Sequence, residues 1–245
     1  MTPSKKQFIL SFISFVLLFS FDSFAQDHNK YDENGKRTGI WRKYYPNKRI
    51  RYSGQFVNGK EVGTFKYFDI LSSKHPTAIK KFYSKSDSAF VQFFTTEGVL
   101  RSKGMMHNRD RVGKWMYYFP TGKVFSEEFY IQGKLDGEVK TFYKNGNIFE
   151  ISHYKNGLKD GVMKRYSDKE ILIEEVFYVN GKLNGEGKYY DLQGNLKEKG
   201  IYKNNKRFGK WEFYIGGELV DEKKKKELNK FNTSQLKKND SISKN

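Results

Sequence analysis

The sequence predicts an all-β protein: an elongated, solenoid-like, single-layer antiparallel β-meander of eight hairpin repeats of about 24 residues. Three observations support this. A glycine returns every 24 residues, Asn-Gly pairs separate runs of aromatic residues, and no helical hydrophobic period follows residue 25. The glycine, which we number position 0 of each unit, falls at Gly39, Gly63, Gly113, Gly137, Gly161, Gly185 and Gly209, and Ser88 fills the gap between the two series.

Large apolar residues recur at fixed distances from position 0. Position +5 is aromatic in every unit, as Tyr44, Phe68, Phe93, Tyr118, Phe142, Tyr166, Tyr190 and Tyr214. Position +2 carries Trp41, Phe65, Phe90, Trp115, Val139, Met163 and Trp211, with Gly187 as the exception. Aromatic and β-branched residues suit half-buried strands, so these runs are predicted to be strands.

Turn signals separate the strands. Asparagine occupies position −5 in most units and is often followed by glycine, as at Asn58-Gly59 and Asn180-Gly181. Both residues of such a pair accept positive φ, which makes Asn-Gly the strongest short-range hairpin signal. A second turn follows each glycine-bearing strand, as at Asn145-Gly146. Each unit is therefore predicted to hold two strands and two turns.

Sixteen such strands would extend roughly 75 Å at the usual spacing between neighbours. A propeller is disfavoured because a blade needs about 40 residues. The unit between Gly63 and Ser88 is irregular, since it lacks Asn-Gly and contains Pro76, which cannot donate to a ladder. We expect a longer loop and a local defect in the sheet there. It is either a binding loop or a tolerated insertion, and we favour the insertion.

The chain divides into a signal peptide over 1–25, a repeat domain over 26–220 and a Lys-rich tail over 221–245. Two lysines, a 14-residue apolar run and small residues before Gln26 indicate a cleaved secretory signal. An uncleaved anchor is the alternative, although roughly 20 apolar residues are needed to span a bilayer. The tail is predicted to be disordered, with a short helix over 221–231 as the alternative. Because the chain also lacks cysteine, we expect an exported bacterial protein, periplasmic or extracellular after cleavage.

Residues 113–122 read GKWMYYFPTG, and residues 154–161 read YKNGLKDG. This alternation resembles the MORN repeat, in the variant of exported bacterial proteins, and the resemblance covers roughly residues 31–220. It implies a single-layer sheet of stacked hairpins used for contact with proteins or membrane lipids, with no shared catalytic residues. Similar chains are labelled antitoxins of a toxin–antitoxin class, a role that export argues against because a cytoplasmic toxin would be out of reach.

Catalytic, cofactor-binding and metal-binding residues are all predicted to be absent. The four histidines fall at unrelated repeat positions without metal-ligand spacing. The best carboxylate pair is Asp136 and Asp160, each just before its glycine. Two strand spacings would put them about 10 Å apart, which is too wide for a retaining glycosidase and slightly too wide for an inverting one. Asp before Gly is ordinary turn chemistry, so we predict a structural role and no enzyme.

Charge carries the main functional signal. The chain has a net charge of +18, of which the predicted repeat domain holds about +13. Position +3 is often basic and shares a strand face with the aromatic +5, unless a bulge at Gly-x-Trp merges the two faces. The candidate ligand-contacting residues are Arg42, Lys66, Lys140, Lys164, Lys188, Tyr44, Phe68, Phe142, Tyr166 and Tyr190. The structural residues are the seven position-0 glycines with Trp41, Trp115 and Trp211. Lysine stems that cover ring edges explain the face without a ligand, and we favour that interpretation.

These features predict a non-enzymatic scaffold of the bacterial envelope that binds a protein partner or a second copy of itself. The alternative is a module for anionic lipid headgroups or acidic envelope glycans, whose binding would weaken as salt rises. An antitoxin-like component is the third hypothesis. Nucleic acid suits a basic aromatic surface but is disfavoured by export. No cofactor is expected.

Overall fold

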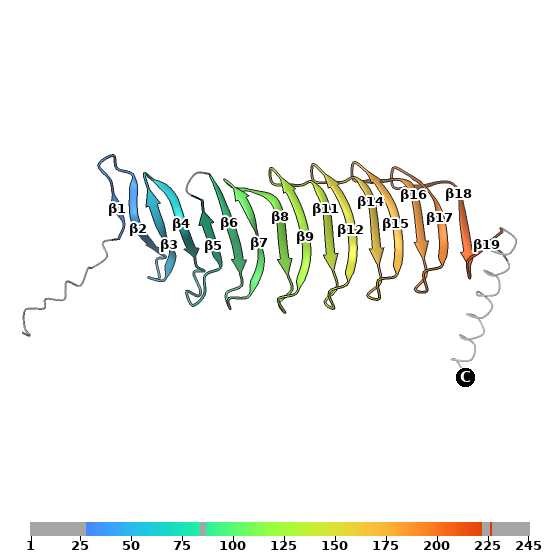
Figure 1. Cartoon of the computed structure of the whole chain (residues 1–245), viewed down its shortest axis with the longest axis horizontal. Helices are drawn as coiled ribbons and strands as arrows, with labels where there is room; N and C mark the ends of the chain where they lie inside the picture. Colours follow the sequence, from blue (N-terminus) through green and yellow to red (C-terminus); the bar gives the residue numbers. More distant parts are fainter. Residues whose placement is uncertain (1–27, 84–86, 222–225, 227–245) are drawn as a thin grey trace, which may run out of the picture.

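The computed structural model describes residues 28–83, 87–221 and 226, and these form one open antiparallel sheet of 19 strands (Figure 1). The strands stack side by side along the long axis of the molecule. They are β1 (Lys30–Tyr31), β2 (Arg37–Tyr44), β3 (Ile50–Val57), β4 (Lys60–Tyr67), β5 (Ala78–Phe82), β6 (Ser88–Phe94), β7 (Leu100–His107), β8 (Asp110–Tyr118), β9 (Val124–Ile131), β10 (Lys134–Leu135), β11 (Gly137–Phe142), β12 (Ile148–Lys155), β13 (Leu158–Lys159), β14 (Gly161–Tyr166), β15 (Leu172–Val179), β16 (Lys182–Tyr190), β17 (Leu196–Lys203), β18 (Lys206–Ile215) and β19 (Glu218–Val220). The predicted all-β meander is confirmed; the predicted signal peptide and nearly all of the predicted tail lie outside the described residues.

The strands group into eight hairpin units. Each unit opens with a strand that carries position 0 and closes with its partner, from β2–β3 to β18–β19. Two opening strands are split at a single residue, Asp136 between β10 and β11 and Asp160 between β13 and β14. β1 is an added edge strand that pairs with β2. The two splits and this edge strand account for the difference between the sixteen predicted strands and the 19 observed.

The Asn-Gly turns have the predicted backbone conformation. Position −5 has φ between 48° and 55° in six units, at Asn58, Asn108, Gln132, Asn156, Asn180 and Asn204. The following residue also has positive φ at Gly59, Gly133, Gly157, Gly181 and Asn205. Two such residues in succession are typical of a type I′ turn, whose twist matches that of the flanking strands.

A bulge at position 0 brings the +2 side chain onto the preceding strand. In the β3–β4 pair, residues 63–65 stand opposite Gly54 alone. Gly63 has φ 65°, a conformation that costs other residues about 1–2 kcal/mol. The β7–β8 and β17–β18 pairs show the same register shift, and in β15–β16 it is displaced by one residue, to Phe177. The bulge lays the ring of Phe65 on Gly54, where an added Cβ would lie 2.4 Å from the ring.

The residue at −9, beneath the +2 side chain, is matched to it in size. Three large rings rest on glycines: Phe65 on Gly54, Trp115 on Gly104 and Trp211 on Gly200. Where +2 is a smaller side chain, as Val139 and Met163, position −9 holds Glu128 and Ser152. The buried core consists of these +2 side chains together with Trp41, Phe56, Val91, Tyr130 and Val176. The sheet is therefore stabilised by its own side chains lying flat across it.

Gly187, the exception at +2, has a steric reason. An added Cβ there would lie 2.8 Å from the ring of Tyr202 and 3.5 Å from Val176. Tyr202 lies edge-on against Trp211, with ring centroids 5.0 Å apart. The ring of Tyr202, from the strand that closes the same unit, thus fills the space that a +2 side chain would take.

The third unit is centred on Ala89, and the prediction of Ser88 at position 0 is wrong. In the first unit the +2 tryptophan lies opposite a glycine, and in the third unit Val91 lies opposite Gly104 in the equivalent place. Ala89 stands 24 residues before Gly113, so the period holds from there onward. Two residues are inserted before it, and the predicted longer loop covers residues 68–77 between β4 and β5.

This correction changes the assignments around it. Val91, which is fully buried, takes +2 in place of Phe90, and Phe94 takes +5 in place of Phe93. β5 and β6 pair without a register shift, because alanine does not readily adopt the positive φ that the bulge requires. The predicted defect is thus one missing bulge in an unbroken ladder.

Hydrogen bonds between successive turns run along one edge of the sheet. Turn amides donate to carbonyls one unit back: Gly59 N to Arg37 O, Gly133 N to Arg111 O, Gly157 N to Leu135 O and Gly181 N to Lys159 O, at 2.7–3.0 Å. Asp136 and Asp160 add to this row, since their Oδ2 atoms accept hydrogen bonds from the amides of Asn156 and Asn180, each at 3.0 Å. Both aspartates serve the turns, as predicted.

The ring-on-glycine contact can be tested with one methyl group. We expect Gly104→Ala to lower the free energy of unfolding by about 1–3 kcal/mol, the usual cost of overpacking, because the ring of Trp115 must move. Ser152→Ala is the matched control at the same repeat position beneath Met163, with an expected change under about 1 kcal/mol. Urea denaturation followed by tryptophan fluorescence measures both, and equal losses would contradict the contact.

The turn-to-turn bond of Asp160 can be tested separately. Asp160→Ala removes a charge-assisted acceptor and should cost about 1–2 kcal/mol of stability. It should also speed hydrogen exchange at the Asn180 amide, which donates to that carboxylate. Asp160→Asn keeps an acceptor oxygen and should therefore lower the free energy of unfolding less. Unchanged hydrogen exchange at the Asn180 amide in Asp160→Ala would contradict this hydrogen bond.

Candidate functional site

The two faces of the sheet differ in chemistry. Directly paired residues of neighbouring strands share a face. Positions −11, −9, −7, +2 and +4 lie on what we call the aromatic face, which holds the buried core; positions −10, −8, +1 and +3 lie on the charged face. Tyr118 at +5 also lies on the charged face, because its hydroxyl donates to Sδ of Met116 at 3.6 Å. Lys103 Nζ lies 5.5 Å from the centre of that ring.

Three of the five candidate cations are paired with carboxylates. On the charged face Lys140 Nζ lies 2.8 Å from Glu138, and Lys164 Nζ lies 3.2 Å from Glu175. Hydrogen bonds to these neighbouring carboxylates raise the pKa of both lysines. A formal row of positive charge is therefore balanced here by acidic residues on the same and adjacent strands.

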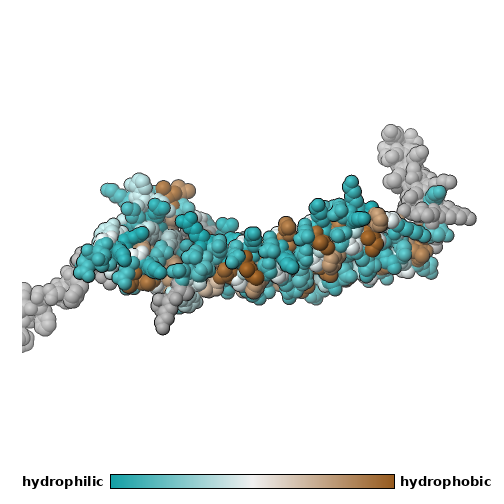
Figure 2. Space-filling model, turned by 90° about the horizontal axis from the view of Figure 1, so that it is seen from above, coloured by the Kyte–Doolittle hydropathy of each residue, from teal (hydrophilic) through white to brown (hydrophobic). Residues whose placement is uncertain are grey.

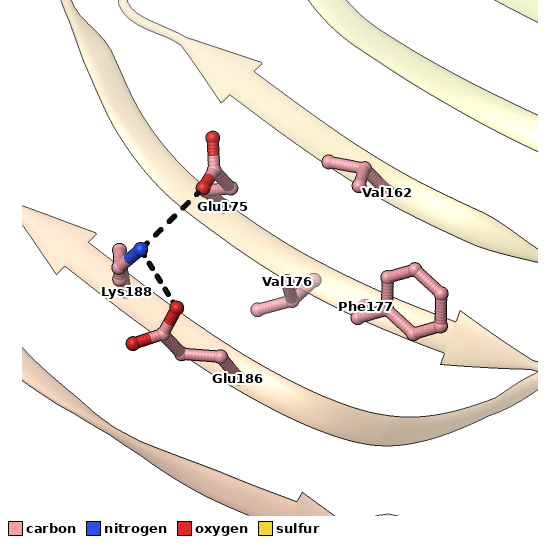
Figure 3. A pocket seen from close by; sticks show the side chains of 6 residues that line it. All are labelled: Val162, Glu175, Val176, Phe177, Glu186 and Lys188. Carbon is pink, nitrogen blue, oxygen red and sulfur yellow. Dashed lines mark ion pairs between the residues drawn. The ribbon is translucent and has the colours of Figure 1, made fainter.

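Lys188 is held between two carboxylates, as Figure 3 shows. Its Nζ lies 2.7 Å from Glu186 and 3.9 Å from Glu175, and the hydrogen bond to Glu186 raises its pKa. With Val162 and Phe177 these residues line a hollow of about 160 Å³. The same repeat positions, 48 residues earlier, line a second hollow of about 250 Å³ around Phe129. These are shallow, charge-balanced depressions of the charged face.

The other two candidate cations differ. Arg42 and Lys66 are exposed, and the described part of the chain contains no ion pair to either. The five candidate cations therefore fall into two groups. Arg42 and Lys66, nearer the N-terminus, have no ion pair among the described residues, and the three lysines nearer the C-terminus are paired with glutamates.

The +5 rings pack against aliphatic partners. Each regular +5 residue pairs directly with an aliphatic residue on the next strand: Tyr44 with Ile50, Phe94 with Leu100, Tyr118 with Val124, Phe142 with Ile148, Tyr166 with Leu172 and Tyr190 with Leu196. Phe68, the candidate in the irregular unit, begins the 68–77 loop, and its amide donates to Arg51 O. Tyr44 remains half exposed, whereas burial and nearby Glu175 raise the pKa of Tyr190. These rings thus form a structural row along the sheet.

Charge is unevenly distributed along the sheet. Residues 28–123 contain 20 Lys and Arg against 7 Asp and Glu, a net charge of +13. Residues 124–221 contain 16 of each, a net charge of zero. The basic character of the repeat region is therefore confined to its N-terminal half, which includes Arg42 and Lys66.

An arginine accompanies every tryptophan on the aromatic face. The three tryptophans each stand four residues after an arginine, in the pattern Arg-x-Gly-x-Trp. The guanidinium carbon lies over the indole at 5.5 Å for Arg37 and Trp41, 4.9 Å for Arg111 and Trp115, and 4.0 Å for Arg207 and Trp211. Arginine stacks well on aromatic rings because its charge is delocalised over a plane. These pairs cover the rings that a second layer would otherwise cover.

Farther along this face, carboxylates form an ion-pair network. Glu150 accepts from Lys159 at 2.8 Å and from Arg165 at 3.3 Å, and Arg165 also lies 2.7 Å from Glu174. Burial opposes ionisation of Glu150, but the hydrogen bonds from Lys159 and Arg165 outweigh it and lower its pKa. The two carboxylates and the two cations of this network balance one another.

A wide hollow lies on the aromatic face between β5 and β8. It has a volume of about 850 Å³, and Arg101, Arg111, Ser102, Phe93 and Tyr117 contribute to its wall. An equivalent hollow of about 620 Å³ lies between β15 and β17, beside Glu198. The aromatic face is therefore grooved, most deeply next to the irregular unit.

The described residues contain no group of three or more His, Asp or Glu placed to hold a metal ion. None of their elements is a helix with the length and apolar character needed to cross a membrane. Asp136 and Asp160, the best catalytic pair from the sequence, are engaged by turn amides. The features left to consider in the described residues are the two faces of the sheet and their hollows.

Two features were readable from the sequence but were not used in its interpretation. The Arg-x-Gly-x-Trp spacing marks the cation–ring pairs, and a running count of charge marks the two halves. The carboxylate partners of Lys164 and Lys188 needed the strand register, because Glu175 comes from the strand between them.

The profile of the family described as MORN repeat variant matches four segments: residues 37–58, 111–132, 135–156 and 183–204. Each begins two residues before position 0 and ends in the next Asn-Gly or Gln-Gly type of turn, so each match is one hairpin unit. No curated protein sequence matches the chain. Repeats of this family are non-catalytic modules that bind proteins or membrane lipids. The chain is thus a repeat protein with MORN repeat variant segments at four positions of its eight-unit sheet.

Proposed function

We propose that this chain is a non-enzymatic scaffold of the bacterial envelope that binds a protein partner. The observation that carries the proposal is an exposed apolar row on the charged face. Phe129, Phe177, Ile201 and Phe208 are 39–56% exposed, although they lie on regular strands. Ile201 and Phe208 are directly paired, and Phe129 and Phe177 recur at the repeat position of Ile201 in other units. Exposed apolar patches of this kind can serve as interaction surfaces.

The surroundings of this row favour a protein over a purely charged ligand. The row lies mainly in the half of net charge zero, where lysines and glutamates alternate in ion pairs. A protein surface can match both charge signs and cover apolar side chains at once. Figure 2 shows hydrophobic residues in separate groups along the body with hydrophilic residues between them, so a partner would contact several units.

The envelope location rests on the N-terminal residues alone. The apolar run after two lysines supports export, but residues 1–27 lie outside the described part of the chain. The same feature weighs against an antitoxin-like role, because an exported chain does not meet a cytoplasmic toxin.

A second candidate function is supported by the charge of the N-terminal half. Anionic lipid headgroups or acidic envelope glycans would be attracted to residues 28–123, whose net charge is +13. Near a surface each added cation contributes about 1 kcal/mol to such binding. This function would use Arg42 and Lys66, and the apolar row would lie outside its contact surface.

The protein-partner proposal predicts a loss of capture on one face. A tagged chain of residues 26–245 should recover a stoichiometric protein from envelope extracts, and Phe177→Ser with Ile201→Ser should abolish that recovery. Leu71→Ser with Leu192→Ser is the control, because these residues are 79% and 66% exposed but lie in turns. Circular dichroism checks that the variants fold. Equal recovery by both double variants would refute the role of the row.

The anionic-surface candidate predicts a difference between the two halves. Arg42→Gln with Lys66→Gln should weaken cosedimentation with anionic vesicles at low salt by about tenfold or more, because two unpaired cations are lost. Lys140→Gln with Lys164→Gln removes the same charge at the same repeat position, but from lysines already paired with glutamates, and should have less effect. Equal effects, or equal binding to neutral vesicles, would exclude this function.

A further inference from the structure

The three arginine–tryptophan pairs differ in the residue that a neighbouring strand brings to the guanidinium. Arg207 donates to Glu198 Oε1 at 2.9 Å. Arg37 lies 3.5 Å from the hydroxyl of Tyr52, which stands on the following strand β3 and not at position −11 of the arginine's own unit. For Arg111, in the fourth unit, position −11 holds Ser102, and no described residue accepts a hydrogen bond from the side chain of Arg111. Arg111 is thus a partly buried cation, held over three rings, without the anion that its counterpart has.

Position 102, where the carboxylate side chain is missing, lies in the wall of the 850 Å³ hollow. Arg111 and Ser102 both line it, and Arg101 adds a second cation that has no recorded ion pair among the described residues. The rings of Phe93, Tyr117 and Phe125 form apolar walls. A hollow with few cations and several rings has the composition of a small-molecule site.

The irregular unit helps to build this hollow. Asp69 and Thr77, at either end of the 68–77 loop, are part of its wall. Asp69 Oδ1 accepts the Leu71 amide at 2.8 Å, so this carboxylate is engaged within the loop and does not reach across to Arg111 as Glu198 reaches Arg207. The two-residue insertion therefore encloses the hollow and leaves the arginine open.

We propose that this hollow binds the carboxylate of a small organic acid between Arg111 and Arg101. The carboxylate occupies the place that the Glu198 carboxylate takes beside Arg207. The body of the ligand lies on Phe93, Tyr117 and Phe125. The planar guanidinium fork matches a carboxylate in a bidentate arrangement, which gives the site its chemical preference.

The site is independent of the protein-binding function proposed above, because it lies on the opposite face of the sheet. Two kinds of acid share the required chemistry: aromatic carboxylates, whose rings stack on the walls, and sugar carboxylates, whose C–H faces do so. Benzoate and glucuronate represent them, with benzyl alcohol and glucose as neutral counterparts.

The test uses the full chain, with isothermal titration of each probe. We expect at least one of the two acids to bind with one site per chain and at least tenfold more tightly than its neutral counterpart. Arg101→Gln should weaken that binding at least tenfold without disturbing the stacked Arg111. Inorganic phosphate that binds as tightly as either acid, or a neutral counterpart that does so, would overturn the assignment.

Two exchanges of side chains between the units make the test sharper. Ser102→Glu should supply the missing carboxylate, raise the melting temperature and abolish probe binding. Glu198→Ser should remove the internal carboxylate from Arg207 and open a second site, so that the stoichiometry rises from one to two. Unchanged probe binding in Ser102→Glu would refute the position of the site. A stoichiometry that stays at one in a folded Glu198→Ser variant would refute the equivalence of the two arginines.

Discussion

The contact between each +2 side chain and the residue at −9 on the preceding strand is the interaction on which the rest of this structure depends. A single-layer sheet has no second layer to cover its hydrophobic residues, so burial must come from side chains that lie flat across neighbouring strands. The bulge at position 0 makes this geometry, because its extra residues bring Phe65, Trp115 and Trp211 down onto glycines. A glycine is needed at both ends of the contact, one for the backbone conformation and one for the space beneath the ring. This double requirement explains why glycine occupies position 0 in every unit but that of Ala89, whereas the glycine at −9 appears under the largest rings.

Most of the fold could be predicted because every unit repeats the same local signals. The Asn-Gly turns and the glycine period determined the hairpins, their number and their order. The position of Ala89 could not be predicted, because counting from glycine to glycine places the nearest small residue, Ser88, in the gap. The strand register settles the assignment, because Val91 pairs with Gly104 as Trp41 pairs with Gly54, which places Ala89 at position 0. The strand splits at Asp136 and Asp160 could not be predicted either, because these two residues stand at the same repeat position as Asn184, which lies within the unbroken strand β16.

The candidate site was predictable in part. Alternation along a strand correctly brought +3 and +5 to one face, as Met116 and Tyr118 illustrate. The charge of that face was not predictable from position +3 alone, because Glu175 reaches Lys164 and Lys188 from a strand between theirs. Counting the cations at position +3 alone therefore overestimates the positive charge that a ligand would meet on this face. Pairing across strands decides which of these cations are available, and it leaves only the N-terminal ones unpaired.

Specific sites in a repeat protein arise where the repeat fails. Eight identical units would present the same groove eight times, which suits avidity but cannot single out one ligand position. Here several departures coincide around the third and fourth units: the two-residue insertion, the missing bulge at Ala89, the serine at position 102 and the end of the basic half. Each of these departures is tolerated because a unit contacts only its neighbours, so a change in one unit does not alter the packing of distant units. The stabilising contacts set the period, and the departures from it surround the 850 Å³ hollow of the aromatic face with two arginines.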